Sequence, residues 1–230
     1  MKVLILINKV GLGDCIIHLN YIHEISKKYE KPVSILAKEN TRAKDLFQDD
    51  PHIKEVITLD RLEDNTGSHD GLNGFIKLIK DIKEKKFDKV FIFNSSVRYF
   101  LVCKFAGIKK IAQYPLFKKK GQHVVNTAKI FTENEIDKIV STQPKLFVNQ
   151  DKILKAQKKM SFNNKCIVLG ISASGPTKRW EIKNFIKLSE KINQKFPSKF
   201  YLAAGKNDQP LINEISNSNI GSNCVSLNNL

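Results

Sequence analysis

The chain has 230 residues and a mass of 26.2 kDa, a length between that typical of one domain and that of two. Hydrophobic residues make up 41% and charged residues 27% of it, which allows a packed core and excludes wholesale disorder. Basic residues outnumber acidic ones by 39 to 23, so the formal net charge is +16. The longest apolar runs, such as residues 3–7, are too short to cross a bilayer, and no signal peptide is recognisable, so we expect a cytoplasmic protein.

Lysine carries almost all of the positive charge. The chain has only four arginines, at positions 42, 61, 98 and 179, and an A/T-rich genome explains much of this lysine excess. Nucleic-acid readers use arginine forks for bases and aromatic side chains for stacking, and neither accompanies the scattered lysines. We therefore expect no nucleic-acid partner. A basic surface would still attract a phosphorylated substrate, or hold the protein peripherally at the anionic cytoplasmic face of the inner membrane.

The four cysteines lie singly along the chain, at positions 15, 103, 166 and 224. There is no C-x-x-C pair and no histidine at ligand spacing from them, which argues against a disulfide framework and a structural zinc site. We expect four reduced thiols and no metal.

The first half of the chain alternates between strand and helix patterns. Residues 2–8 form a continuous apolar run, as a strand buried on both faces requires, and apolar residues at helical spacing follow it. The expected elements are a strand at 2–8, a helix at 15–29, a strand at 33–37, a short helix at 41–47, a strand at 55–59, a loop at 60–74, a helix at 75–82, a strand at 89–93, a helix at 97–105 and an edge strand at 109–112.

The alternation weakens from about residue 113 and resumes after residue 160. We interpret this stretch as an inter-domain connection, with polar helices at 122–131 and 150–160 and a short extended run at 145–148. The expected elements beyond it are a strand at 166–171, a loop at 172–177, a helix at 185–196, a strand at 200–203, a helix at 209–216 and a strand at 224–227. The sequence thus predicts an α/β protein with two Rossmann-like parallel-sheet domains, 1–160 and 161–230, of which the second is incomplete.

Two glycines and an aspartate follow the first strand. Ligands of open parallel sheets bind at such loops, and Gly11 and Gly13 permit positive φ and a close approach of the backbone to a ligand. The segment is not a G-x-G-x-x-G dinucleotide fingerprint, because Ile16 replaces the third glycine and Asp14 would oppose a pyrophosphate. Asp14 either caps the helix that follows or acts as a general base on a substrate hydroxyl.

The loop at 172–180 has the composition of an anion-binding site. It combines an open glycine turn with hydroxyls and two cations just before a helix. The residues concerned are Ser172, Ser174, Gly175, Thr177, Lys178 and Arg179. A plain surface turn is the alternative in a chain this rich in lysine. Trp180, the only tryptophan, is more typical of packing at a helix–sheet junction than of a sugar platform.

Four segments in order resemble family 9 glycosyltransferases, the ADP-heptose:lipopolysaccharide heptosyltransferases and their relatives. They are K-V-L-I-L-I-x-x-x-G-L-G-D at 2–14, D-D-P-H-I-K-E-V-I-T-L-D at 49–60, S-A-S-G-P-T-K-R-W at 172–180 and A-A-G-K-N-D at 203–208. The resemblance implies a GT-B fold, with the acceptor held mainly by the first domain and the nucleotide sugar by the second. It further implies that Asp14 is the base and that Lys178 lies near phosphate groups.

The implied reaction is an inverting transfer of a heptose, or a similar sugar, from a nucleotide-diphosphate donor to a lipopolysaccharide-core or related glycan acceptor. Such a transfer needs one carboxylate at the acceptor hydroxyl and positive charge at the departing diphosphate. The chain contains no D-x-D pair, so we expect cationic side chains rather than a metal at the leaving group, and no cofactor.

The sequence also departs from the family pattern. His18 and Asn20 stand where the family often has threonine and proline; His18, one turn beyond Asp14, could line the acceptor pocket but is more typical of a structural histidine. The family's later D-[ST]-G-x-x-H type loop has no counterpart, so we expect a fragment or a truncated gene product. A non-catalytic nucleotide- or phosphate-binding Rossmann module, or an inactive remnant that folds only over about its first 115 residues, remain the alternatives.

Overall fold

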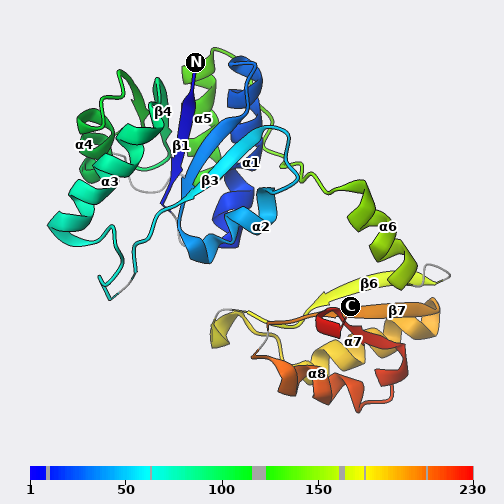
Figure 1. The fold of residues 1–230 in the computed structure, drawn as a ribbon. Helices are drawn as coiled ribbons and strands as arrows, with labels where there is room; N and C mark the ends of the chain where they lie inside the picture. The colour runs from blue at the N-terminus through cyan, green and yellow to red at the C-terminus, as the bar shows by residue number, and fades with distance from the viewer. Residues whose placement is uncertain are drawn as a thin grey trace. The chain divides into compact units, whose positions relative to one another are not determined.

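The computed structural model describes residues 1–8, 11–62, 64–115, 123–160, 164–173, 175–205 and 207–229. The chain divides into two compact units, Met1–Val148 and Asn149–Leu230 (Figure 1). The division falls earlier than the expected boundary after residue 160, so the helix at Gln150–Lys159 belongs to the second unit.

The first unit is built on a parallel sheet of five strands in the order β3-β2-β1-β4-β5. The strands are β1 (Val3–Ile7), β2 (Val33–Ala37), β3 (Ile53–Thr58), β4 (Lys89–Ile92) and β5 (Lys110–Gln113). The helices are α1 (Leu12–Lys28), α2 (Ala43–Phe47), α3 (Gly71–Lys85), α4 (Val97–Phe105) and α5 (Val124–Ile136). Every expected strand of this unit is present within two residues of its expected bounds, and the helix expected at 97–105 has those bounds.

Helices cover both faces of this sheet, as the unbroken apolar run of β1 requires. Val3, Ile5 and Ile7 pack against α1 and α5, whereas Leu4 and Leu6 face α3 and α4. All five residues of β1 are at most 2% exposed. As a result, the loops that follow β1 and β4 lead to helices on opposite faces of the sheet.

Two expectations for the first unit need correction. Helix α5 is not a mere connection, because Ala128, Phe131 and Ile136 lie in the core that α1 and the sheet form. Helix α3 begins at Gly71, inside the expected loop, and a Cβ at Gly74 would lie 2.2 Å from the His69 backbone carbon. A glycine inside the first turn of α3 therefore reflects a close backbone approach rather than a loop.

The second unit has a parallel sheet in the order β6-β7-β8, formed by β6 (Lys165–Gly170), β7 (Ser198–Ala203) and β8 (Cys224–Ser226). Its helices are α6 (Gln150–Lys159), α7 (Ile182–Lys195) and α8 (Gln209–Ser216). Helices α7 and α8 lie on one face of the sheet, where Leu169, Phe200 and Leu202 pack against them. Val168, on the neighbouring position of β6, is 59% exposed. The two-sheet α/β prediction is confirmed.

The extended run expected at 145–148 forms no regular element. The helix expected at 122–131 is α5, and its expected first residue, Gln122, lies outside the described residues. In the part of the chain that the structure describes, no helix is both long and apolar enough to span a membrane.

Candidate active site

Three loops that lead into helices share one local geometry, at residues 11–14, 67–70 and 205–208. Each has the sequence G-x-x-D, and the aspartate N–H donates to the glycine carbonyl over 2.9 to 3.1 Å. In return the glycine N–H donates to the aspartate Oδ2 over 3.1 to 3.2 Å. The arrangement holds a carboxylate at the start of α1, α3 and α8, where the helix dipole favours negative charge. The three carboxylates differ in what else they contact.

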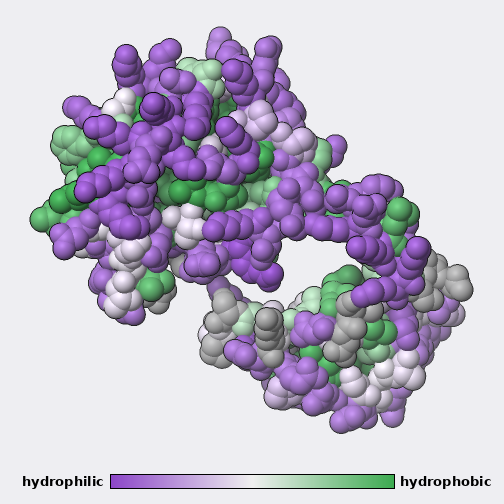
Figure 2. All heavy atoms as spheres, viewed as in Figure 1, coloured by the Kyte–Doolittle hydropathy of each residue, from purple (hydrophilic) through white to green (hydrophobic). Residues whose placement is uncertain are grey.

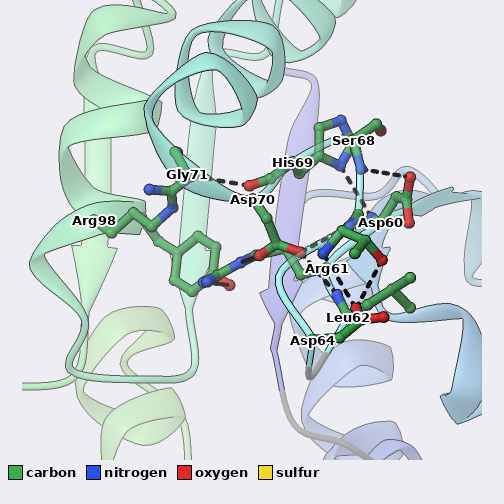
Figure 3. A network of polar contacts seen from close by, with 12 residues as sticks. Asp60, Arg61, Leu62, Asp64, Ser68, His69, Asp70, Gly71 and Arg98 are labelled. Carbon is green, nitrogen blue, oxygen red and sulfur yellow. Dashed lines mark hydrogen bonds and ion pairs between the residues drawn. The ribbon is translucent and has the colours of Figure 1, made fainter.

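The Asp70 carboxylate forms its hydrogen bonds within its own loop (Figure 3). Arg61 Nε donates to Asp70 Oδ1 over 2.7 Å, and the Leu62 N–H donates to Oδ2 over 2.9 Å. The hydrogen bond from Arg61 is the main reason that the pKa of Asp70 lies below its usual range. The Asp70 side chain is 1% exposed, so both oxygens are committed to holding the loop after β3.

Two further side chains fix the same loop. His69 Nδ1 accepts the N–H of Asp60 at 3.0 Å, so its proton sits on Nε2, which donates to Asp81 Oδ2 over 2.9 Å. Arg98 Nη2 donates to the carbonyls of His69 and Gly71 over 2.9 and 3.0 Å (Figure 3). The loop between β3 and α3, which falls within the loop expected at 60–74, is therefore held by several side chains.

The Asp208 carboxylate also has partners beyond its own glycine. It links the loop at 205–208 to the loop at 172–180. The Ser172 hydroxyl donates to Asp208 Oδ2 over 2.5 Å, and Arg179 Nη2 lies 3.6 Å from Oδ1. Arg179 Nε also donates to the carbonyl of Ala173. The hydrogen bond from Ser172 is the main cause of the lowered pKa of Asp208. Sequence reasoning quoted Asp208 in a motif but assigned it no role.

Asp14 is the exception among the three. Its Oδ2 accepts the Gly11 N–H at 3.2 Å, which is the capping interaction considered as the alternative to a catalytic role. Within the described residues, no hydrogen bond or ion pair reaches its Oδ1, and the side chain is partly exposed. Capping and base catalysis are therefore compatible, because capping uses one carboxylate oxygen only.

The position of Asp14 in the sheet also favours a ligand site. Strands β1 and β4 are neighbours, and the helices that follow them, α1 and α4, cover opposite faces. The loops after these strands diverge there, which is where open α/β sheets bind ligands. Asn94 follows β4, and its Nδ2 is buried without a hydrogen-bond partner in the described part of the chain. Asn94 is a polar residue at this edge that sequence reasoning missed.

The glycines of the first loop do not use the conformational freedom that glycine permits. Gly11 has φ −137°, which any residue can adopt, and Gly13 lies within α1. A Cβ at Gly13 would meet nothing within 4 Å, and one at Gly11 would only touch Asp14 Oδ2 at 3.5 Å. Neither glycine is required by its own backbone conformation. The open space above Gly13 still fits a close approach by a ligand.

The loop at 172–180 is exposed at its cationic end. The Lys178 N–H donates to the Gly175 carbonyl over 3.0 Å, closing a 3-10 turn at Pro176–Lys178. The ammonium group of Lys178 makes no ion pair with any described residue, and Thr177 is exposed beside it. Ser174, predicted to bind substrate, lies outside the described residues. Lys178 is thus available to an anionic ligand, whereas Ser172 and Arg179 are engaged by Asp208.

Two aromatic side chains near the predicted sites have structural contacts. His18 is fully buried, its Nδ1 lies 2.6 Å from the Asp14 carbonyl oxygen, and its ring meets Phe93 edge to face at 5.0 Å. The structural interpretation of His18 is therefore favoured over a place in an acceptor pocket. Trp180 is half exposed and packs edge to face on Phe185 at 5.0 Å.

All four arginines lie in or beside loops at the carboxyl ends of strands, and each makes two contacts with its guanidinium group. Arg42 contacts Asp45 through two nitrogens, and the other three join side chains to carbonyls, carboxylates or a phenol. The guanidinium group carries its N–H donors in a rigid planar fork, which suits it to hold several acceptors of a loop at once.

A cavity of about 200 Å³ lies at the carboxyl ends of β2 and β3. Its polar lining includes Lys38, Glu39, Arg42 and Asp45. Among the residues that the structure describes, no three His, Cys, Asp or Glu side chains come together as a metal site would require. Of these charged groups, Arg42 and Asp45 are paired with each other.

Comparison with known proteins relates this chain to one family. The model of glycosyltransferase family 9 (heptosyltransferase) matches residues 75–227, a span that includes Lys178 and follows Asp14. No curated protein sequence matches the chain. The solved structure of E. coli ADP-heptose LPS heptosyltransferase II has a TM-score of 0.73 and 18% identity, and the match covers 99% of this chain and 72% of that one.

Two further solved structures share the fold. The family 9 glycosyl transferase from Veillonella parvula DSM 2008 has a TM-score of 0.73 at 16% identity, over 94% of this chain and 66% of that one. The E. coli heptosyltransferase WaaC with ADP-2-deoxy-2-fluoro heptose has a TM-score of 0.65 at 10% identity, over 99% of this chain and 76% of that one. The expected GT-B-like fold is confirmed. Because the family model matches well over half of its residues, the chain belongs to glycosyltransferase family 9, the heptosyltransferase family.

Proposed function

We propose that this protein transfers a heptose, or a similar sugar, from a nucleotide-diphosphate donor to a lipopolysaccharide-core or related glycan acceptor, with inversion at the anomeric carbon. ADP-heptose is the proposed donor, since one similar structure is that of an ADP-heptose LPS heptosyltransferase and another is that of a heptosyltransferase with ADP-2-deoxy-2-fluoro heptose. The acceptor-side loops belong to the first unit and the donor-side loops to the second.

Asp14 acts as the general base in this proposal. Its carboxylate takes the proton of the acceptor hydroxyl as that oxygen bonds to the anomeric carbon of the donor sugar. The bond from that carbon to the diphosphate oxygen breaks, and the nucleoside diphosphate leaves with the bonding electrons. One inversion results because a single displacement occurs.

A single observation carries the assignment of Asp14. Of three aspartates with the same G-x-x-D geometry, it is the one whose Oδ1 has no partner among the described residues. A carboxylate that is held in place through one oxygen keeps the other for proton transfer. The hydrogen bond that caps the helix therefore also orients the Asp14 carboxylate.

Lys178 stabilises the negative charge that develops on the departing diphosphate. Its ammonium group is exposed and makes no ion pair within the described residues, so a phosphate need not displace a carboxylate to reach it. Gly175 and Thr177 offer backbone N–H and hydroxyl donors in the same loop, and Ser172 and Arg179 support its shape. Cationic and backbone donors of this kind let the transfer proceed without a metal or another cofactor.

The experiment is a transfer assay with ADP-heptose and a lipopolysaccharide-core acceptor, which measures release of the nucleoside diphosphate. Asp14→Asn should lower kcat by about 10² to 10⁴ while leaving the folded state intact. Asp151→Asn, which removes a carboxylate from the first turn of α6, is the matched control and should retain wild-type rates. Transfer by Asp14→Asn at a near wild-type rate would exclude Asp14 as the base.

The phosphate role is tested separately. Lys178→Ala should lower kcat/KM by about 10²-fold, and Lys187→Ala, an exposed lysine on α7, should leave it unchanged. Unchanged kinetics for Lys178→Ala would favour the plain surface turn. Calorimetric binding of ADP-heptose without any transfer to an acceptor would instead favour a nucleotide-binding module.

A further inference from the structure

Helices α3 and α4 present large apolar side chains to solvent on the face that points away from the sheet. Leu72 is 76% exposed, Ile76 is 47% exposed and Phe105 is 59% exposed. Leu72 and Ile76 are one turn apart on α3, and the Phe75 ring meets the Phe105 ring edge to face at 6.4 Å, which joins the two helices. These four residues are the α3–α4 patch. Figure 2 shows hydrophobic side chains at the surface on this side of the first unit, bordered by hydrophilic ones.

The patch is not needed for the fold of the first unit. Helix α3 packs on the sheet through Leu78 and Ile82, and helix α4 does so through Tyr99, Val102 and Cys103. Leu72, Ile76 and Phe105 are exposed, whereas Phe75 is partly buried and also packs against this core. Exposed apolar residues that adjoin one another in this way are typical of surfaces that contact a partner.

The segment of the chain that contains the patch is strongly basic. Residues 71–110 contain ten basic and three acidic side chains, a net charge of +7. Lys80 follows Ile76 by one turn and Lys104 adjoins Phe105; neither forms an ion pair with a described residue. Asp81, one of the three acids, is already engaged by His69 and Lys77. The cations beside the patch are thus uncompensated.

We propose that the α3–α4 patch docks onto an anionic lipid bilayer. Apolar side chains enter the boundary between headgroups and acyl chains, and the neighbouring lysines bind lipid phosphates. A nucleic acid would satisfy the lysines but not the apolar residues, and an apolar protein surface would leave the lysines uncompensated. An anionic bilayer satisfies both.

The docking surface also suits the proposed function. Helices α3 and α4 begin at the carboxyl edge of the sheet, where the loops of the acceptor side lie. A bilayer against this side would bring that edge close to an acceptor anchored in lipid. That membrane docking serves to reach the acceptor rests on the proposed sugar transfer. Vesicle binding is measured without a sugar donor, so the docking proposal and the transfer proposal can each fail without the other.

The test is co-sedimentation of the purified chain with vesicles of phosphatidylglycerol and phosphatidylethanolamine, with vesicles of phosphatidylcholine as the neutral comparison. Binding should be confined to the anionic vesicles and should weaken at high salt. Leu72→Ser/Phe105→Ser should lower the partition coefficient about tenfold, as expected when two inserted side chains are lost. Ile130→Ser/Ile139→Ser, at two exposed isoleucines outside the patch, should bind as the wild type does.

The charge contribution is tested with variants of equal net charge. Lys80→Gln/Lys104→Gln should lower the partition coefficient about tenfold, whereas Lys155→Gln/Lys158→Gln on α6 should change it less than twofold. Equal losses in both lysine pairs would overturn the proposal in favour of diffuse attraction by net charge. Binding of all variants at the wild-type level would also overturn the proposal. Absence of vesicle binding, with a wild-type dimer that Leu72→Ser/Phe105→Ser dissociates, would assign the patch to a second copy of this chain.

Discussion

Asp14 and Asp70 make the same two hydrogen bonds with a glycine three residues before them, Asp14 in the first turn of α1 and Asp70 just before α3, but their carboxylates have different further contacts. Asp70 is buried and bound by Arg61 and by the Leu62 N–H. Asp14 is partly exposed, and within the described residues its Oδ1 receives no hydrogen bond.

The exchange of hydrogen bonds between an aspartate and the glycine three residues before it therefore says nothing by itself about function. A carboxylate at the N-terminus of a helix stabilises that helix wherever it occurs. Whether the carboxylate also does chemistry depends on whether its second oxygen is already used. Asp70 and Asp208 hold loops in place, and Asp14 has an oxygen to offer a ligand.

The largest expected difference between the two regions is in stability. Asp70→Asn should lower the free energy of unfolding by about 3 kcal/mol, because the partly buried Arg61 loses its carboxylate and the loop amides lose an acceptor. Asp14→Asn should lower it by less than about 1 kcal/mol, since one exposed capping bond is weakened. Urea unfolding of the two variants measures both values.

The effect of Asp70 should also depend on pH with a definite sign. Its pKa is lowered in the folded chain, so its stabilisation is complete above the unfolded value near 3.9 and is lost as the pH falls through the folded value. The difference between wild type and Asp70→Asn should therefore be constant from pH 5 to 8 and shrink below about pH 4. Equal stability of Asp14→Asn and Asp70→Asn at pH 7 would contradict the comparison.

Much of the fold follows from the sequence because the strands are buried on both faces. The apolar runs at β1, β2 and β4 leave no alternative to a covered parallel sheet, and each lies close to its expected bounds. The start of α3 was missed because Gly71 and Gly74 are typical of a loop. Gly71 has a φ of 60°, which favours glycine, and Gly74 approaches the His69 backbone closely; no local pattern contains that contact.

The candidate site could be predicted only in part. Asp14 and Lys178 could be proposed from the sequence because they follow strands and lie close to glycines. The partners of the other two aspartates are distant in sequence, since Arg61 lies 9 residues from Asp70 and Ser172 lies 36 from Asp208. The repeated G-x-x-D motif can be seen in the sequence. The three aspartates differ in what their carboxylates bind, and only the tertiary structure shows this.

The next expected difference concerns the glycines that precede the two aspartates. A Cβ at Gly67 would lie 2.5 Å from the Asp60 carbonyl oxygen, which belongs to the backbone and cannot turn aside. Gly67→Ala should therefore lower the free energy of unfolding by about 2 kcal/mol. Gly11→Ala meets only ordinary contact and should cost less than about 1 kcal/mol, the difference between glycine and alanine at a helix N-cap. Thermal unfolding distinguishes the two, and an equal loss in both would show that the loop at Asp14 is as tightly packed as the loop at Asp70.

The smallest expected effect concerns Asp208, which orders a loop that we assign to the donor. Asp208→Ala removes the acceptor of the Ser172 hydroxyl and the counterion of Arg179, so the loop that carries Lys178 becomes less ordered. We expect KM for the donor to rise about fivefold, the scale of one exposed ion pair, with kcat nearly unchanged. Asp208→Asn keeps an amide oxygen for Ser172 and should raise KM less than Asp208→Ala does. A fall in kcat as large as that of Asp14→Asn would show that Asp208 takes part in the reaction itself, and the division into one reacting and two ordering carboxylates would then be wrong.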